Sequence, residues 1–191
     1  NEEIRNIEAQ LLALREPLRK QLLAKRTEGE ESTVAGPKPF AAWDFSKGTK
    51  DQLGQAHLSL EGGAKVEGGA LVLDGKRVFA RSQPLAKRLR DKTLEAWVQL
   101  SDLGQKGGGV ITVQTRDGVN FDSIVYAEKQ GRHWLAGSEN HKRTDEFNGS
   151  KEKEALEGPV HVAIVYHADG KITGYRNCKP YGLTFRRDAL R

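Results

Sequence analysis

Short apolar runs separated by glycine-containing turns are the feature that most limits what this chain can fold into. Asp-Gly and Asn-Gly pairs supply the positive φ that tight β-hairpins need, and paired glycines adopt such conformations without steric cost. The signals recur from residue 62 onward, and they are Gly62-Gly63, Gly68-Gly69, Asp74-Gly75, Gly107-Gly108-Gly109, Asp117-Gly118, Asn148-Gly149 and Asp169-Gly170. Short strands joined by such turns, without helices between them, predict an antiparallel all-β sandwich over residues 40–191.

The expected strands lie between these turns and are rich in β-branched and aromatic residues. Residues 93–100 and 160–167 alternate most clearly, as half-buried strands do, and we expect Trp43 and Trp97 to lie in the core because of their strand contexts. The other expected strands are 41–44, 56–60, 70–73, 109–115, 123–127, 134–138 and 172–176.

The first 39 residues have a different character. Apolar residues at spacings of three and four over residues 1–26, from Ile4 to Leu22, predict an amphipathic helix or a helix pair kinked at Pro17. Such a short apolar stripe needs a partner to be stable in water. Residues 27–39 are polar, then rich in glycine and proline, and are expected to form a linker.

Composition excludes several classes of protein. The 191 residues are 37% hydrophobic and 30% charged, and no apolar run reaches the ~18 residues of a membrane span. The single cysteine, Cys178, excludes an internal disulfide, a Cys-rich zinc site and a Cys-x-x-Cys-His haem attachment. The sequence begins with Asn1 and contains no methionine, which predicts a piece of a longer protein.

The formal net charge of +5 includes one tight basic cluster, formed by Lys87, Arg88, Arg90 and Lys92. Such a cluster can meet phosphates or acidic sugars. A solvated loop between strands accounts for the same residues. We therefore expect no nucleic-acid partner.

Several segments together resemble the LamG-like domain, a jelly roll of the concanavalin A-like lectin and glucanase class. They are Leu94–Val98 with 107–115, and Val160–Tyr166 with 169–177. Residues 121–128, 132–138 and 143–144 are similar to the version carried by large planctomycete proteins that also contain a c-type cytochrome module. The resemblance covers residues 40–191 and implies a periplasmic, cell-envelope or secreted parent protein, with any haem c outside this chain.

The sequence departs from the family's pattern in two places. Asn177-Cys178 stands where the family usually has Asn-Gly, and cysteine is strained at positive φ, so this turn is of another type or strained. The family's sandwich also continues beyond Lys179–Gly182 with closing strands, so we expect the jelly roll here to be incomplete.

Glucanases of this fold carry a catalytic carboxylate pair on one strand, in the pattern Glu-x-Asp-x-x-Glu or a close relative. The sequence contains no such pattern, and no catalytic residues are predicted. Glu152, Glu154 and Glu157 lie in a charged loop and are expected to be solvated. Polysaccharide hydrolysis is therefore the weakest hypothesis, and substitution of Glu95 or Glu128 would test it.

Two segments are candidate binding sites. Asp117, Asn120 and Asp122 offer hard oxygen ligands within one loop, which makes it a candidate calcium site. Asp and Asn also simply form turns.

The second segment contains Arg132, His133 and Trp134, with Arg143 further on, and mixes an aromatic ring with hydrogen-bond donors as sugar-binding sites do. Trp134 beside Leu135 and Ala136 equally fits a core position.

These observations favour a non-catalytic module that binds a glycan or a protein within a larger envelope-associated protein. The alternative is a purely structural domain that positions neighbouring domains of the parent chain. The predicted amphipathic helix, which needs a partner, is the observation that favours this alternative. The sandwich prediction does not by itself choose between them, because one fold hosts many functions.

Overall fold

The computed structural model describes residues 10, 17 and 37–188. The predicted helix over 1–26 lies outside these residues except for Gln10 and Pro17, and the predicted linker 27–39 lies outside them except for 37–39. The chain divides into two compact units, the smaller containing the described residues up to Ala42 together with Gln52–Gly54. The larger unit, Trp43–Asp51 and residues 55–188, holds the strands described below.

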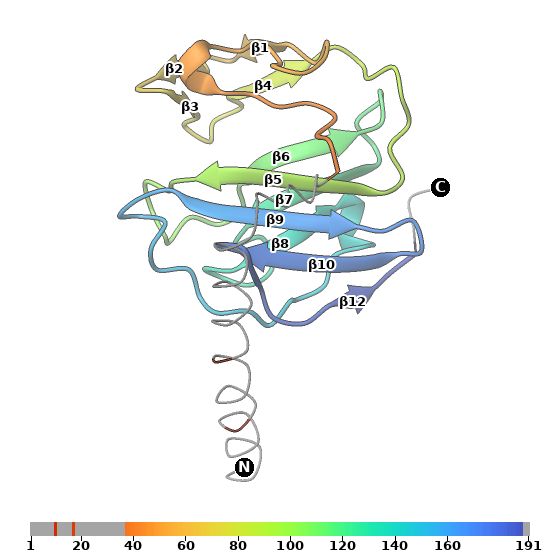
Figure 1. Cartoon of the computed structure of the whole chain (residues 1–191). Coiled ribbons are helices and arrows are strands. Elements are labelled where there is room, and N and C mark those ends of the chain that lie inside the picture. Colours follow the sequence, from red (N-terminus) through yellow and green to blue (C-terminus); the bar gives the residue numbers. More distant parts are fainter. Residues whose placement is uncertain (1–9, 11–16, 18–36, 189–191) are drawn as a thin grey trace. The chain divides into compact units, whose positions relative to one another are not determined.

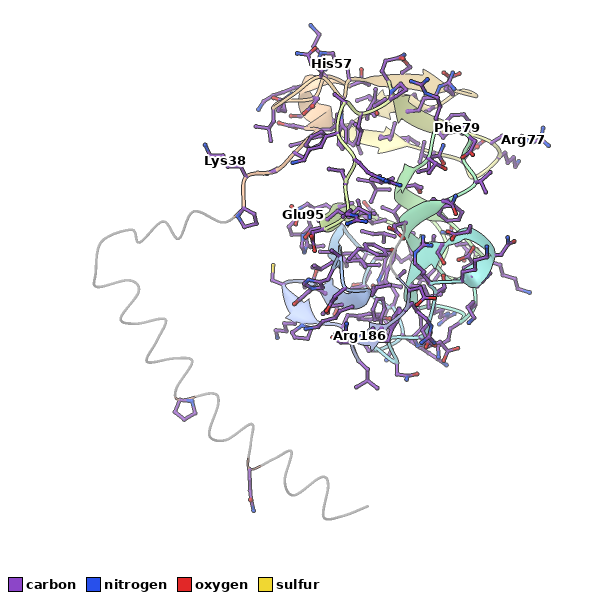
Figure 2. The ribbon with its side chains drawn as sticks, turned by 90° about the vertical axis from the view of Figure 1, so that its right-hand side faces the viewer. Lys38, His57, Arg77, Phe79, Glu95 and Arg186 are labelled. Carbon is purple, nitrogen blue, oxygen red and sulfur yellow. The ribbon has the colours of Figure 1, made fainter. Side chains whose placement is uncertain are left out.

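One antiparallel sheet is built on three long strands, β5 (Lys92–Val98), β9 (Val160–Tyr166) and β10 (Lys171–Arg176), with β9 in the middle. The two-residue strands β11 (Lys179–Pro180) and β12 (Phe185–Arg186) pair with opposite ends of β10. Figure 1 shows the broad side of this sheet, with β7 and β8 behind it. Figure 2 shows Glu95 of β5 far from Arg186 of β12, because they belong to opposite edges of the sheet.

A second antiparallel sheet contains β6 (Gly109–Gln114), β7 (Phe121–Tyr126) and β8 (Trp134–Ser138), with β7 in the middle. A register shift between Gly109 and Ile111 marks a bulge at the start of β6. All residues of β8 are buried, whereas none of β6 is fully buried. The second sheet is therefore covered at one edge and exposed at the other.

The core lies between the two sheets. Alternation along β9 places Val160, Val162, Ile164 and Tyr166 on the inner face, and these residues pack against Ile124 and the other inward side chains of β7. The buried cluster is Leu94, Leu100, Ile124, Tyr126, Ala127, Trp134, Ala136, Phe147, Ala155, Val160, Val162, Ile164, Tyr166, Ile172 and Tyr181. Two sheets with one shared core confirm the expected all-β, sandwich-like architecture.

The remaining elements are short. Strands β1 (Leu58–Glu61) and β4 (Phe79–Ser82) form one two-stranded sheet, and β2 (Lys65–Glu67) and β3 (Ala70–Val72) form another. The single-turn 3-10 helices η1 (Phe45–Lys47) and η2 (Glu139–His141) complete the described elements. The strand expected at 41–44 is only an isolated bridge between Trp43 and Asp51.

The turn between β10 and β11 shows how Cys178 is accommodated. Arg176 pairs with Lys179, so Asn177 and Cys178 form a two-residue hairpin loop. Both have positive φ, 46° and 60°, which is the type I′ conformation that the right-handed twist of hairpin strands favours. The hairpin is therefore the one that Asn-Gly normally makes, and Cys178 occupies the position that normally carries glycine.

Replacing Cys178 with glycine should stabilise the protein by about 0.5–1 kcal/mol. Relief of the left-handed conformation gains about 1–2 kcal/mol, and the greater freedom of glycine in the unfolded chain offsets about 0.4–1 kcal/mol of that gain. Urea unfolding of Cys178→Gly should show a higher midpoint with an unchanged slope. The matched control is Gly170→Ala, at φ 85° in the turn before β10, which should lower the midpoint. A lower midpoint for Cys178→Gly would contradict the strain.

Candidate functional site

The outer face of the β5–β9–β10 sheet carries the most exposed large aromatic side chain of the described strands. Alternation directs Leu94 and Ala96 inward, so Trp97 points outward, and it is 72% exposed. The expectation that Trp97 lies in the core is therefore wrong. Trp43, the other tryptophan expected there, is partly buried, and its indole nitrogen donates to the Ala56 carbonyl at 2.8 Å.

Trp97 lies directly opposite His161 of β9, and the two rings are tilted against each other with centroids 5.3 Å apart. Glu95 is two residues before Trp97 on the same face, and one of its carboxylate oxygens is 3.7 Å from Nε2 of His161. The Glu95 side chain is 65% exposed and that of His161 is 15% exposed. An aromatic face, a carboxylate and an imidazole thus meet at one place on the sheet surface.

The same face continues onto β10. Ala163 lies opposite Glu95 on one side and opposite Tyr175 on the other, and it is itself buried. Tyr175 is half-buried. The backbone positions of Trp97 and Tyr175 are about 12 Å apart, since they are separated by two strand spacings and one two-residue step. We call Trp97, Glu95, His161 and Tyr175 the outer-face cluster.

One atom of this cluster is unusual. Nδ1 of His161 is the one buried side-chain nitrogen or oxygen without a hydrogen-bond partner among residues 37–188. A buried N–H without an acceptor costs about 1–3 kcal/mol. The proton of a neutral His161 is therefore better placed on Nε2, which faces Glu95.

Two of the three residues predicted to bind a ligand at 132–134 are buried, unlike Trp97 and Glu95 of the outer-face cluster. Trp134 is 1% exposed and belongs to the core, so the core alternative describes its position. His133 is also buried, with Nδ1 2.8 Å from the Gly131 carbonyl, while Arg132 is exposed at the preceding turn. The Trp134 ring is therefore not available to a ligand at the surface.

The indole nitrogen of Trp134 donates to Glu152 at 2.6 Å, and Glu152 is fully buried. The expectation of a solvated Glu152 is wrong. Its carboxylate also accepts two bonds from Arg176, both at 2.8 Å, and backbone N–H bonds from residues 153, 154 and 155. A buried carboxylate is tolerated here because all of its acceptor positions are used.

Burial alone raises the pKa of Glu152, but the hydrogen bonds from Arg176, Trp134 and the backbone outweigh burial and lower it from 4.5 to about 2. Glu154, which shares Arg176 at 2.8 Å, is 66% exposed at its side chain. The two glutamates of this loop thus differ sharply in environment.

Arg143 and Asp122, predicted for two different sites, meet in a second buried cluster together with Lys92. Asp122 contacts Lys92 Nζ at 2.7 Å and Arg143 Nη2 at 2.8 Å, and all three side chains are 8% exposed or less. Arg143 also contacts Glu139 at 2.6 Å. Lys92 is the first residue of β5, and its side chain is a buried ion-pair partner. The interpretation of the basic cluster as a solvated loop is therefore wrong for Lys92.

A pocket of about 110 Å³ opens beside this second cluster. Its lining includes Arg90, Lys92 and Arg143, but also Asp122 and Asp188, so positive and negative charges nearly balance. The hydroxyl of Tyr166, another lining residue, donates to the Ser123 carbonyl at 2.8 Å. The ion pair of Lys92 with Asp122 and the hydrogen bond from Tyr166 to Ser123 join the two sheets at this end.

The residues of the candidate calcium loop have separate partners. Asp117 is exposed and accepts bonds from the Thr115 hydroxyl and the Val119 N–H, as in an ordinary turn. Asp122 is directed at Lys92 and Arg143 instead. In the part of the chain that the structure describes, no three His, Cys, Asp or Glu side chains come together as a metal site would require.

Comparison with known proteins gives no relative: no protein-family model, no curated protein and no solved structure matches this chain significantly. Among the described residues no helix is long and apolar enough to cross a membrane.

Arg143→Met should destabilise the protein by about 3–5 kcal/mol, because it leaves the buried carboxylates of Asp122 and Glu139 without their shared cation. Thermal and urea unfolding measure the loss. Arg116→Met, at an exposed position, is the control and should change stability by less than about 0.5 kcal/mol. A tolerated Arg143→Met would show that the cluster does not hold the sheets together.

The lowered pKa of Glu152 should appear in the pH dependence of stability. Its contribution, about 3 kcal/mol, is fully present above pH 4.5 and is lost as the pH falls toward 2, because the unfolded state then binds the extra proton. Urea unfolding from pH 7 to pH 2 should therefore show a flatter profile for Glu152→Gln than for the original chain. Glu154→Gln, with its exposed side chain, should keep the original profile.

Proposed function

We propose that this chain is a non-catalytic binding module that recognises a glycan or a protein. The observation that carries the proposal is the outer-face cluster, in which Trp97 is 72% exposed beside Glu95 and His161. A tryptophan left in water costs free energy that burial against a ligand would recover. The antiparallel, sandwich-like fold supports the proposal because such sheets present broad, rigid faces.

A binding role is favoured over hydrolysis by the number of carboxylates on this face. Glycoside hydrolysis uses two carboxyl groups on either side of the scissile bond. Among the outward-facing residues of β5, β9 and β10, Glu95 is the one carboxylate. A single carboxylate beside an exposed ring fits recognition better than bond cleavage.

The wider setting of the proposal rests on the resemblance to LamG-like jelly rolls in large planctomycete proteins. We place the module in a larger envelope-associated or secreted protein, beside domains that include a c-type cytochrome module. Haem attachment through two cysteines would then reside in those other domains, because this sequence has the single cysteine Cys178. Neighbouring domains of the parent chain are then further partners.

Trp97→Ala should remove most of the binding while leaving stability within about 0.5 kcal/mol, because the side chain is largely in water. The measurement is a glycan array with, in parallel, a pull-down of proteins from cell-envelope extract. Phe79→Ala is the control, since Phe79 is an aromatic on β4 with 46% exposure (Figure 2). No ligand for the original chain in either assay would favour the purely structural role.

A further inference from the structure

We infer that the outer-face cluster binds an uncharged glycan, with one pyranose ring stacked on Trp97 and its hydroxyls held by Glu95 and His161. This inference rests on the proposed binding function and names its ligand class. It is carried by three features of the cluster: an isolated exposed ring, a pair of polar atoms at a suitable distance, and the sign of the local charge.

The surroundings of Trp97 fit a sugar better than an apolar protein surface. A docked helix or sheet buries a continuous apolar patch. Among the outward-facing residues of β5, β9 and β10, Trp97 is the one large hydrophobic side chain that is strongly exposed. The residues beside it on that face are His161, directly opposite, and Glu95, two residues earlier, so the ring adjoins groups that hydrogen-bond. A pyranose has the same character, with an apolar C–H face and a polar rim.

The distance between Glu95 and His161 suits a bridging hydroxyl. At 3.7 Å, Oε2 of Glu95 and Nε2 of His161 are too far apart for a good direct hydrogen bond. One hydroxyl oxygen at about 2.8 Å from each atom can lie to the side of the pair, donating to the carboxylate and accepting from Nε2–H. Because Nδ1 is buried without a partner, the imidazole proton belongs on Nε2, which is the arrangement that this bridge needs.

The charge of the face excludes acidic sugars. Glu95 is adjacent to the ring, so a uronate or sulfate stacked on Trp97 would meet a carboxylate at short range. Lys171, the basic residue that shares this face, is at the far end of β10, about 20 Å away along the strands. The cluster therefore selects neutral rings.

Tyr175 extends the surface beyond one ring. It lies across Ala163 from Glu95, about 12 Å from Trp97, a span longer than a single pyranose. An oligosaccharide that reaches both aromatic rings gains a second contact. The second contact costs less entropy than the first, because the ligand is already held at one end. We therefore expect neutral oligosaccharides to bind more tightly than monosaccharides.

The test is titration calorimetry of the 191-residue chain with a panel of neutral gluco-, xylo-, manno- and galacto-hexasaccharides, and with oligogalacturonate as the acidic probe. At least one neutral hexasaccharide should bind, and oligogalacturonate should bind at least about tenfold more weakly. Trp97→Ala should weaken neutral binding about tenfold or more, whereas the Phe79→Ala control should leave it unchanged.

Glu95→Gln separates the role of charge from that of shape. It should lower the affinity for the neutral oligosaccharide severalfold, since an amide is a poorer acceptor than a carboxylate. It should also reduce the ratio of the affinities for the neutral and the acidic probes, because the repelling charge is gone. Circular dichroism and urea unfolding confirm that each variant is folded.

Each other outcome overturns the inference. Neutral binding that survives Trp97→Ala would place the site elsewhere but keep the proposed function, as would preferred binding of oligogalacturonate. Capture of an envelope protein through Trp97 with no glycan bound would keep a binding module and reject the ligand class. No binding to glycan or protein would reject both proposals.

Discussion

The buried carboxylate of Glu152 is the interaction on which the rest of the sandwich depends. It accepts the indole N–H of Trp134 from one sheet and the guanidinium of Arg176 from the other, and its remaining acceptor positions are used by the backbone of its own turn. One carboxylate thus fixes the spacing of two sheets and the path of the loop between them. Because a charge without partners is very costly in a core, these contacts form together or not at all.

A second cluster does similar work with different chemistry. Asp122 enters from the middle strand of the smaller sheet and meets Lys92 at the start of β5, while Arg143 ties it to η2 through Glu139. Burial alone raises the pKa of Glu139, yet the hydrogen bonds from Arg143 keep it below its ordinary value, so the cluster stays charged. Both clusters lie away from Trp97 and Glu95, whose side chains on the outer face of the larger sheet are largely exposed.

Turn chemistry made much of the fold predictable. Asp74-Gly75, Asp117-Gly118 and Asp169-Gly170 all place glycine at positive φ, and the strands between the predicted turns agree to within a few residues. The short strands at 65–67, 79–82, 179–180 and 185–186 were not predicted, because two to four residues carry too little alternation to be recognised.

The candidate site was less predictable, for a reason that lies in strand geometry. Alternation in Leu94–Val98 shows that the strand has two different faces. Because one face carries Leu and Ala and the other carries Trp, the sequence does not tell which face is buried until the opposing sheet is known. Likewise, a glutamate in a charged loop such as Glu152 reads as solvated, since its partners Trp134 and Arg176 are distant in sequence. Exposure and ion pairing both depend on tertiary contacts that local pattern does not contain.

Pro180 has a consequence for how this sheet meets other molecules. It occupies the edge strand β11, which is only two residues long and lies opposite Tyr175. Proline has no N–H to offer an incoming strand, and so short an edge gives a foreign strand little to pair with. At this edge, β11 offers an incoming strand almost no backbone groups for pairing. The edge formed by the β10–β11 hairpin is therefore protected from the addition of strands that would build a fibril.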